Sequence, residues 1–411
     1  MVAKAGHGGG AGRRRARARR RSRLPLAAAV TSMVVGLAAI AVAWWADSEP
    51  VPPPQPAATD SPSPTPAGPR QVTVLGAGDV LIHPPVWEQA QADAGGDGFD
   101  FYPIFAALTD AITAADLAIC HLETPLAPPE GPFHGWPQFS APPQLLPALV
   151  EVGYDTCSTA SNHTLDRGEQ GVYRTIDALE EAGLAWAGSA RSAEEAATPT
   201  VLEVTTADGR TVNVGQLSYT FGFNGLLRPE GKEWIANLID VDQILEEAAT
   251  ARAAGAEIVI LSMHWGQEYV VEATATQLEQ AEVLIASDDI DLILGHHAHV
   301  VQPVERFDGG WVVYGMGNQI ARHAQPIDAQ REGAMVTATF VEQDGGWTVT
   351  EIEAIPTWVD LEPQIRLVDL PEALADPDLS EQERGRYQEA YERIATSLNS
   401  RGADADGLLV R

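Results

Sequence analysis

Two histidine-rich segments lie about thirty residues apart in the chain and could hold a metal ion. The first contains His264, and the second, which reads Gly-His-His-Ala-His over residues 295–299, contains three histidines. Imidazole suits Zn, Fe, Mn or Ni, and the alternation of His297 and His299 lets both rings face one point. We therefore predict that these two residues and His264 bind metal, whereas His296 is the least certain member of the group.

Oxygen ligands are expected from three earlier positions, because Asp79, Glu123 and Asn162 each follow an apolar run. Carboxylate and amide oxygens would complete the ligand set that the imidazoles begin. Beside Asn162, His163 could donate a proton, and Asp166 could orient its ring and fix its tautomer. Simpler structural interpretations remain open, since Asp79 could be a turn residue and Asp166 could cap a helix.

Three further residues are candidates for the edge of the site. Glu268 is near enough in sequence to His264 to orient it, and His83 lies four residues from Asp79 and could line a pocket. Asn318 ends a Gly-Met-Gly-Asn turn that could return to the site.

The elements that must position these residues alternate between two kinds. Short apolar runs predict strands, and helical apolar spacing predicts helices. Strands are expected at residues 71–77, 116–120, 155–159, 257–262 and 290–294. Helices are expected at residues 103–115, 144–152, 168–182, 241–254 and 274–287. Ligands bind beyond the carboxyl ends of strands in open α/β sheets, so residues at five strand ends would meet at one site.

Antiparallel hairpins are predicted at three points where Asp-Gly pairs separate strand-like runs. The paired runs are 201–206 with 211–217, 301–307 with 311–314, and 334–342 with 347–355. Alternating strands and helices followed by hairpins indicate a pair of sheets covered by helices, and not one doubly wound sheet. Residues 360–411 are polar, and we expect them to be mostly helical and peripheral.

The N-terminal part of the chain predicts a membrane anchor. Residues 1–23 hold nine basic residues and no acid, and residues 24–46 carry no charge, which is long enough for a helix to cross a bilayer. The basic segment should stay in the cytoplasm and the body outside. A cleaved signal peptide is the alternative, with cleavage near Ala43. Residues 47–70 are rich in proline and should form an extended spacer.

The remainder of the chain is strongly acidic, with 17 basic residues against 57 acidic ones. Binding of nucleic acid through bulk charge is therefore excluded, because it requires a basic face. The only two cysteines, Cys120 and Cys157, lie in apolar runs. A disulfide is permitted outside the cytoplasm, but we expect two buried free thiols. We expect the neighbouring His121 to be structural.

Taken together, the segments resemble the CapA-type capsule-synthesis proteins, also called the poly-γ-glutamate biosynthesis family, within the calcineurin-like metallophosphatase superfamily. The matching segments span residues 71–322 and are Gly78-Asp79, residues 121–126, 161–168, 264–269 and 295–303, and residues 314–318. The resemblance implies a four-layer α/β/β/α sandwich, followed by a C-terminal hairpin and helical extension at residues 323–411.

The same resemblance implies a site with two divalent metal ions, such as Mn, Fe or Zn. The implied metal ligands are Asp79, Glu123, Asn162, His264, His297 and His299. His163 would donate a proton, and paired metals suit in-line attack on phosphorus. The sequence departs from the general phosphatase pattern at the first strand, where Leu81 occupies the histidine position of an Asp-x-His motif. It also has Glu123 in place of an aspartate and Thr164 after the Asn-His pair.

Three functions are compatible with these residues. The first is a membrane-anchored, extracytoplasmic capsule or poly-γ-glutamate biosynthesis protein with a metal-dependent phosphoesterase-like site, whose partners would be polymer synthase or export subunits. The second is a secreted metallophosphoesterase that acts on nucleotides or wall phosphate. The third is a non-catalytic, metal-binding component of a polymer-assembly complex. A phosphoesterase needs cations that face phosphate, and only Arg167 and Arg322 are basic residues close to the motifs.

Overall fold

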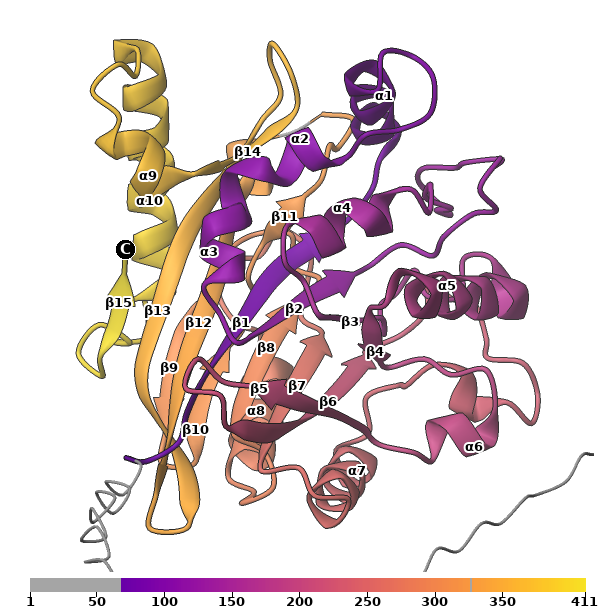
Figure 1. Ribbon diagram of the computed structural model, residues 1–411, viewed down its shortest axis with the longest axis vertical. Helices are drawn as coiled ribbons and strands as arrows, with labels where there is room; N and C mark the ends of the chain where they lie inside the picture. The colour runs from indigo at the N-terminus through magenta and orange to yellow at the C-terminus, as the bar shows by residue number, and fades with distance from the viewer. Residues whose placement is uncertain (1–67, 326) are drawn as a thin grey trace, which may run out of the picture. The chain divides into compact units, whose positions relative to one another are not determined.

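The computed structural model describes residues 68–325 and 327–411 (Figure 1). The basic segment 1–23, the expected membrane helix 24–46 and most of the proline-rich spacer 47–70 lie outside these residues, so these expectations stay predictions. Within the described ranges, no helix has both the length and the apolar character needed to span a membrane. The described residues from Gly68 onward belong to one compact unit.

The first of two sheets has nine strands and contains β1, the strand that carries Asp79. Its parallel part consists of β1 (Gln71–Val80), β2 (Leu117–Leu122), β3 (Thr156–Ser158) and β4 (Ala185–Ala187). Its antiparallel part consists of β12 (Glu332–Gln343), β13 (Gly346–Asp360) and β14 (Arg366–Asp369). Two short strands complete it, β11 (Asn318–Ile320) beside β1 and β15 (Leu408–Val410) beside β13.

The second sheet has six strands in the order β5-β6-β7-β8-β10-β9. They are β5 (Thr200–Thr205), β6 (Thr211–Thr220), β7 (Ile258–His264), β8 (Leu292–His296), β9 (Val304–Phe307) and β10 (Gly310–Val313). The four central strands are parallel, and β5 and β9 form antiparallel hairpins with β6 and β10. The predicted hairpins are therefore confirmed, as is the third one, between β12 and β13.

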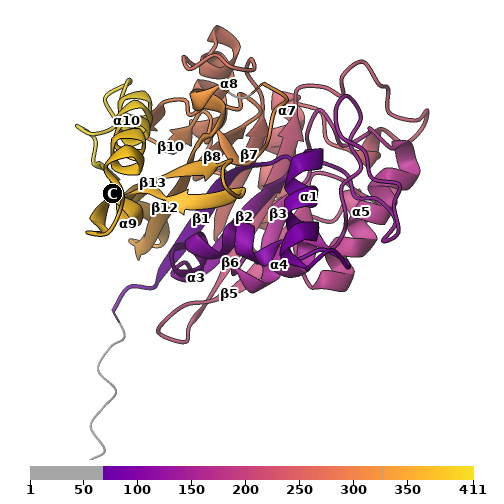
Figure 2. The same cartoon turned by 90° about the horizontal axis from the view of Figure 1, so that it is seen from above.

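Helices cover the outer face of each sheet (Figure 2). On the first sheet lie α1 (Pro84–Asp93), α2 (Tyr102–Phe105), α3 (Thr109–Thr113), α4 (Leu145–Glu151) and α5 (Gly168–Ala182). On the second sheet lie α7 (Val241–Ala253) and α8 (Ala275–Ile285), and the short α6 (Ala193–Ala196) precedes β5. The predicted α/β architecture is confirmed, although residues 103–115 form two short helices joined by a 3-10 turn and not one helix.

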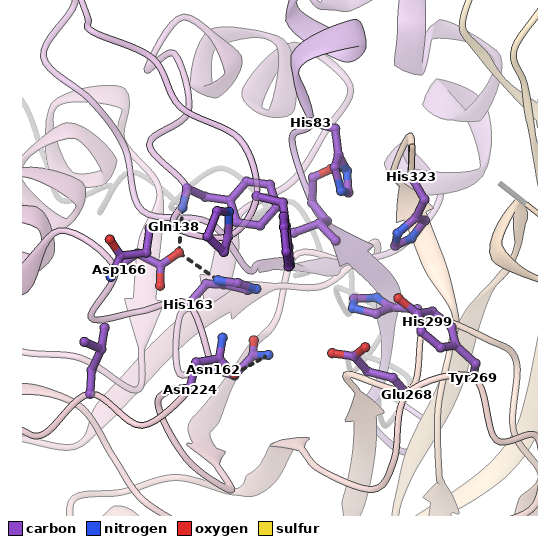
Figure 3. A pocket seen from close by; sticks show the side chains of 15 residues that line it. His83, Gln138, Asn162, His163, Asp166, Asn224, Glu268, Tyr269, His299 and His323 are labelled. Atoms are coloured by element: carbon purple, nitrogen blue, oxygen red, sulfur yellow. Dashed lines mark hydrogen bonds and ion pairs between the residues drawn. The ribbon is translucent and has the colours of Figure 1, made fainter. Parts of the chain in front are cut away.

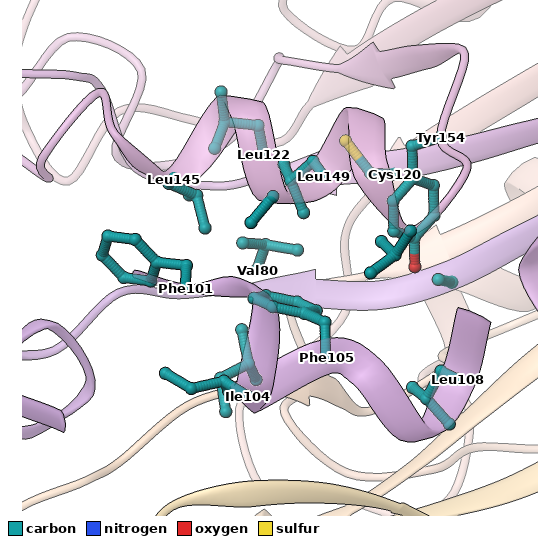
Figure 4. Packing of buried hydrophobic residues seen from close by; sticks show 14 of the residues in the cluster. Val80, Phe101, Ile104, Phe105, Leu108, Cys120, Leu122, Leu145, Leu149 and Tyr154 are labelled. Carbon is teal, nitrogen blue, oxygen red and sulfur yellow. The ribbon is translucent and has the colours of Figure 1, made fainter. Parts of the chain in front are cut away.

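Three hydrophobic clusters fill the spaces between these layers. One lies between the first sheet and its helices and includes Val80, Phe105, Leu108 and Leu149 (Figure 4). A second lies between the two sheets, and a third lies between the second sheet and α7 and α8. Burial of apolar surface on both faces of each sheet stabilises this arrangement.

The C-terminal region is more central than its polar sequence indicates. Strand β12 pairs with β1 along six residues, so the predicted C-terminal hairpin belongs to the first sheet and is not an extension of it. Helices α9 (Leu370–Ala375) and α10 (Glu381–Leu398) lie beside β13 (Figure 1). Their apolar residues, including Tyr387 and Ile394, join the cluster between the sheets. Residues 360–411 therefore add buried apolar side chains to the core.

The two cysteines form a disulfide, so the expectation of free thiols is wrong. Cys120 on β2 and Cys157 on β3 are register partners in neighbouring parallel strands, with Cα atoms 4.5 Å apart. That separation is within the range that a disulfide spans. The apolar surroundings, on which the expectation of free thiols rested, do not distinguish a free pair from a bonded one.

Arg70 connects the beginnings of the two sheets. Arg70 directly precedes β1. It forms an ion pair with Glu257, which precedes β7, and a second one at 2.9 Å with Glu342 on β12. This contact lies at the amino end of β1, whereas Asp79 lies near its carboxyl end.

Candidate metal and phosphoester site

Three histidines face the space between the two sheets because they continue rows of inward-facing core residues. Side chains alternate between the two faces of a strand. Leu117 and Ile119 on β2, Ile258 and Ile260 on β7, and Leu292 and Leu294 on β8 belong to the cluster between the sheets. The next inward positions are His121 on β2 and His296 on β8, and on β7 they are Ser262 and then His264, all of them buried. The hydrophobic layer therefore gives way to a polar one at the carboxyl ends of the strands.

Asp79 joins this polar layer through an irregularity in β1. The register between β1 and β2 shifts between Gly76 and Asp79, which is typical of a bulge, and Asp79 then pairs with His121. The two oxygens of Asp79 face different imidazoles, with Oδ1 3.3 Å from Nδ1 of His296 and Oδ2 3.1 Å from Nδ1 of His299. Burial alone would raise the pKa of Asp79, but these two imidazoles hold the pKa well below its usual value. Asp79 is therefore suited to remain a carboxylate.

Glu123 is an acid without a hydrogen-bond partner. Its side chain is 1% exposed, and no described residue donates a hydrogen bond to either carboxylate oxygen. The nearest imidazole nitrogens are Nε2 of His299 at 3.7 Å and Nε2 of His264 at 4.0 Å from Oε1. Burial raises the pKa of Glu123 well above its usual value. A buried acid is normally paired or bound to metal, so this position fits a cation.

Asn162 and His297 complete the group of expected ligands. Oδ1 of Asn162 lies 3.1 Å from Nε2 of His264, and the rings of His264 and His297 have centroids 4.7 Å apart. No described residue contacts Nδ1 of His297 through a hydrogen bond, and burial lowers the pKa of this ring to about 3. A neutral imidazole with a free nitrogen is the form that binds metal.

The backbone at the second histidine segment is in an unusual conformation. His297 has a φ of 84° and His299 a φ of 54°, in the left-handed region that residues other than glycine rarely adopt. Such strain persists where surrounding structure holds it, and it is concentrated at functional sites. The strained turn directs the ring of His299 toward Asp79 and Glu123 and the backbone N–H of His297 toward Asp79.

The arrangement fits divalent metal ions. Three sets of side chains have potential ligand atoms within 4.8 Å of one another: Asp79 with Glu123 and His299, Asp79 with His121 and His296, and Glu268 with His297 and His299. Four of the six residues that the resemblance implied as ligands belong to these sets. The other two, Asn162 and His264, contact each other, and Nε2 of His264 lies 4.0 Å from Oε1 of Glu123.

His163 and Asp166 lie beside this group and form a pair. Nδ1 of His163 is 2.7 Å from Oδ2 of Asp166, and the same oxygen accepts a hydrogen bond from the backbone N–H of Phe139 at 2.6 Å. Helix α5 begins at Gly168, and Arg167 at its N-cap makes no side-chain capping bond. The alternative that Asp166 caps a helix is therefore wrong, and its geometry is that of a residue that orients His163.

The three candidates for the edge of the site have different outcomes. His83 lines the pocket described below, and Asn318 returns to the site, with Oδ1 3.0 Å from Nδ1 of His299. The expectation that Glu268 orients His264 is wrong, because the two nitrogens of His264 contact His121 and Asn162. Glu268 lies instead beside His297 and His299.

Two buried histidines of the polar layer, His121 and His296, were not among the expected metal ligands. His121 forms hydrogen bonds at 2.8 Å with Ser158 and at 2.9 Å with His264, and its ring stacks on that of His296 at 3.9 Å. The alternation of side chains along β2, β7 and β8 is the signal that places them between the sheets. The expected structural role of His121 is consistent with these contacts.

A pocket of about 370 Å³ opens beside the group of potential ligands (Figure 3). Four imidazoles line it, together with aromatic and amide side chains. These residues include His83, His163, His299, His323, Trp136, Tyr269, Gln138, Asn162 and Asn224. Among the described residues, its lining includes no lysine or arginine. Arg167 and Arg322 do not supply a cation, because Arg167 donates to the backbone carbonyls of Gln138 and Phe139, and Arg322 to that of His323.

Comparison with known proteins places this site in a family. Residues 73–323 match the family model of the bacterial capsule synthesis protein PGA_cap. The chain is 28% identical over 184 residues to the capsule biosynthesis protein CapA of Bacillus anthracis, covering 44% of this chain and 43% of that protein. It is 27% identical over 176 residues to the PGA biosynthesis protein CapA of Bacillus subtilis (strain 168), covering 41% and 43%. The matches therefore span less than half the length of each relative.

Among solved structures, a calcineurin-like phosphoesterase from Bacillus subtilis aligns with 80% of this chain and 97% of its own, at 12% identity and a TM-score of 0.42. A score of this size carries no argument about activity. The family model, in contrast, covers well over half of the chain and includes every candidate ligand from Asp79 to His299. The resemblance recognised in the sequence is thus confirmed, and the protein belongs to the bacterial capsule synthesis family PGA_cap.

Proposed function

We propose that the protein is a metal-dependent phosphoesterase that acts outside the cytoplasm in the assembly of capsule or of poly-γ-glutamate. The observation that carries the proposal is the buried carboxylate of Glu123, which has no hydrogen-bond partner among the described residues and is surrounded by imidazoles. Such a charge is costly unless a cation neutralises it. Membership of the capsule synthesis family supports the proposed pathway.

Two divalent ions would be held by Asp79, Glu123, Asn162, His264, His297 and His299. When bound, they would polarise a phosphoryl group and activate a water molecule for in-line attack. His163, at the wall of the pocket and held by Asp166, is positioned to donate a proton to the leaving oxygen. The aromatic and amide side chains of the pocket would orient the remainder of the substrate and exclude water from it.

The proposed location rests on two features. The basic segment 1–23 and the uncharged segment 24–46 have the composition of an anchor with its N-terminus in the cytoplasm. The disulfide between Cys120 and Cys157 is of a kind that persists in oxidising surroundings outside the cytoplasm. Synthase or export subunits in the same membrane would be the partners.

A second candidate is a metal-binding component of the assembly complex that does not turn over a phosphoester. The composition of the pocket favours it, because no lysine or arginine among the described residues lines the pocket to bind a phosphate. Both candidates bind metal, but only the first hydrolyses a phosphoester.

The full-length protein, purified in detergent, would be assayed for metal content by elemental mass spectrometry and for hydrolysis of bis-p-nitrophenyl phosphate with added Mn²⁺. We expect two ions per chain, and turnover that Asp79→Ala and His163→Ala abolish. His134→Ala is the matched control, because His134 is exposed and does not line the pocket. Metal without turnover would favour the second candidate, and no metal in the wild-type protein would refute both.

A further inference from the structure

His296 is a buried histidine whose one ion-pair partner among the described residues is the carboxylate of Asp79. It ends β8 and is 2% exposed; its Nδ1 faces Asp79 at 3.3 Å, and no described residue forms a hydrogen bond with Nε2. Leaving a polar atom buried and unpaired costs about 1–3 kcal/mol, so a native structure normally gives it a partner. The proposed function assigns no role to this ring.

The carboxylate of Asp79 lies next to His296. Its Oδ1 is 3.3 Å from Nδ1 of His296, while its other oxygen faces His299. Two ligand atoms about 2.1 Å from one ion, at a near-tetrahedral angle, lie about 3.4 Å apart. The observed spacing fits two ligands on one cation, and it also fits a direct ion pair between the two side chains.

Asp79, His121 and His296 form one of the three sets of potential ligands, here called the trio. Both ring nitrogens of His121 already have hydrogen-bond partners. One nitrogen contacts Ser158 and the other contacts His264, whereas the ring lies 3.9 Å from that of His296 at an interplanar angle of 15°. His121 therefore supports the ring of His296 from one side and holds its plane. Asp79 and His296 are left as the two members of the trio with atoms available to an ion.

The position that would normally supply a ligand near Asp79 cannot do so in this chain. Leu81 stands where the general phosphatase pattern has the histidine of Asp-x-His, and it packs in a small apolar cluster with Phe139 and Ala321. An ion held by Asp79 would therefore lack one imidazole from β1. His296 provides one from β8, on the opposite sheet, and its Nδ1 already faces Asp79.

We infer that His296 is a metal ligand. Together with Asp79 it would bind the ion to which a histidine at position 81 contributes a ligand in the general phosphatase pattern. The inference rests on the proposed metal site but not on turnover. It also accounts for the stacked pair of histidines, because the ring of His121 fixes the direction in which His296 presents its nitrogen.

The test uses full-length protein loaded with Co²⁺, because a thiolate bound to Co²⁺ gives a charge-transfer absorption in the near ultraviolet. We expect His296→Cys to show this band and His134→Cys, at an exposed position, to lack it. A His296→Cys protein that retains the wild-type number of ions without the band would overturn the inference.

Metal stoichiometry provides the second readout. His296→Phe keeps a flat ring against His121 and removes both nitrogens, so we expect it to hold one ion fewer than the wild type. Adding Leu81→His should restore that ion, which a merely misfolded protein could not do. Full metal content in His296→Phe would overturn the inference.

The outcomes separate this inference from the proposed function. Two ions and the thiolate band without any phosphodiester hydrolysis would refute the catalytic proposal and leave His296 as a ligand. A wild-type protein that binds no Co²⁺ or Mn²⁺ would refute the metal site and the inference together.

Discussion

Replacing Glu123 by methionine should make the metal-free protein more stable and the metal-loaded protein less stable. The carboxyl is 1% exposed and its oxygens lack hydrogen-bond partners among the described residues, so in the absence of metal it contributes an uncompensated penalty. Removing one unsatisfied buried polar group gains about 1–3 kcal/mol, and methionine fills a similar volume. In a domain of this size we expect the Tm of the metal-free protein to rise by about 2 °C per kcal/mol.

The loaded state should respond in the opposite direction. A ligand at one hundred times its Kd stabilises a folded protein by about 2.7 kcal/mol, and two ions would contribute more. Glu123→Met should lose most of this metal-dependent stabilisation, because Glu123 lies beside His264 and His299, two of the other expected ligands. This stabilisation is measured as the rise in Tm when Mn²⁺ is added to chelated protein.

Thermal denaturation would be followed by circular dichroism with chelator and then with excess Mn²⁺. Glu123→Gln is the control, since it removes the charge but keeps buried polar atoms, and it should gain less stability than methionine in chelator. The reasoning is refuted if Glu123→Met is less stable than the wild type in chelator, or if Mn²⁺ raises the Tm of both proteins equally.

Three other substitutions test separate features. Asp166→Asn should keep both metal ions but lower kcat by about 100-fold or more, because His163 loses the carboxylate that orients it; unchanged kcat in the phosphodiester assay would exclude that role. Cys120→Ala with Cys157→Ala should lower the free energy of unfolding by about 2–5 kcal/mol in urea, and thiol labelling of the denatured wild type should detect no free cysteine. Arg70→Ala should lower the free energy of unfolding by no more than about 1 kcal/mol, because its ion pairs are partly exposed, and it should leave metal content unchanged. A larger loss in urea denaturation would contradict this assignment as a weak surface contact.

Local sequence patterns predicted those elements whose residues interact mainly with near neighbours. Helix α5 and its termination at Gly183, which has a φ of 82°, follow from apolar spacing and from the glycine that a left-handed cap requires. The hairpin of β5 and β6 follows from Asp208-Gly209. The site also followed from local signals, because each ligand directly ends a strand or lies just beyond it.

Long-range pairing could not be predicted in the same way. Strand β12 lies beside β1 although more than 250 residues separate Gln71 from its partner Val341, and nothing in either segment specifies the other. The bulge that turns Asp79 inward depends on the register with β2, and the disulfide depends on the register of β2 with β3. His296 was underrated because a single segment does not reveal which face of a strand meets the opposite sheet.

The expected ligands are divided equally between the two sheets. Asp79, Glu123 and Asn162 belong to the first sheet or the loops that follow its strands, and His264, His297 and His299 belong to the second. The apolar rows between the sheets stop where these residues begin. Bound ions would therefore take the place of the last layer of hydrophobic core and join the two sheets at that end.

Metal loss would then have a mechanical effect as well as a chemical one. The end of the sheet pair near Arg70 would remain joined by its ion pairs. The opposite end would lose the ions and keep only side-chain contacts such as those of Asp79 with His299 and of His121 with His264. Amide hydrogens near the carboxyl ends of β7 and β8 should exchange faster after chelation, and those near Arg70 should not. Inactivation by a chelator would consequently reflect the opening of one end of the sandwich in addition to the absence of the ions.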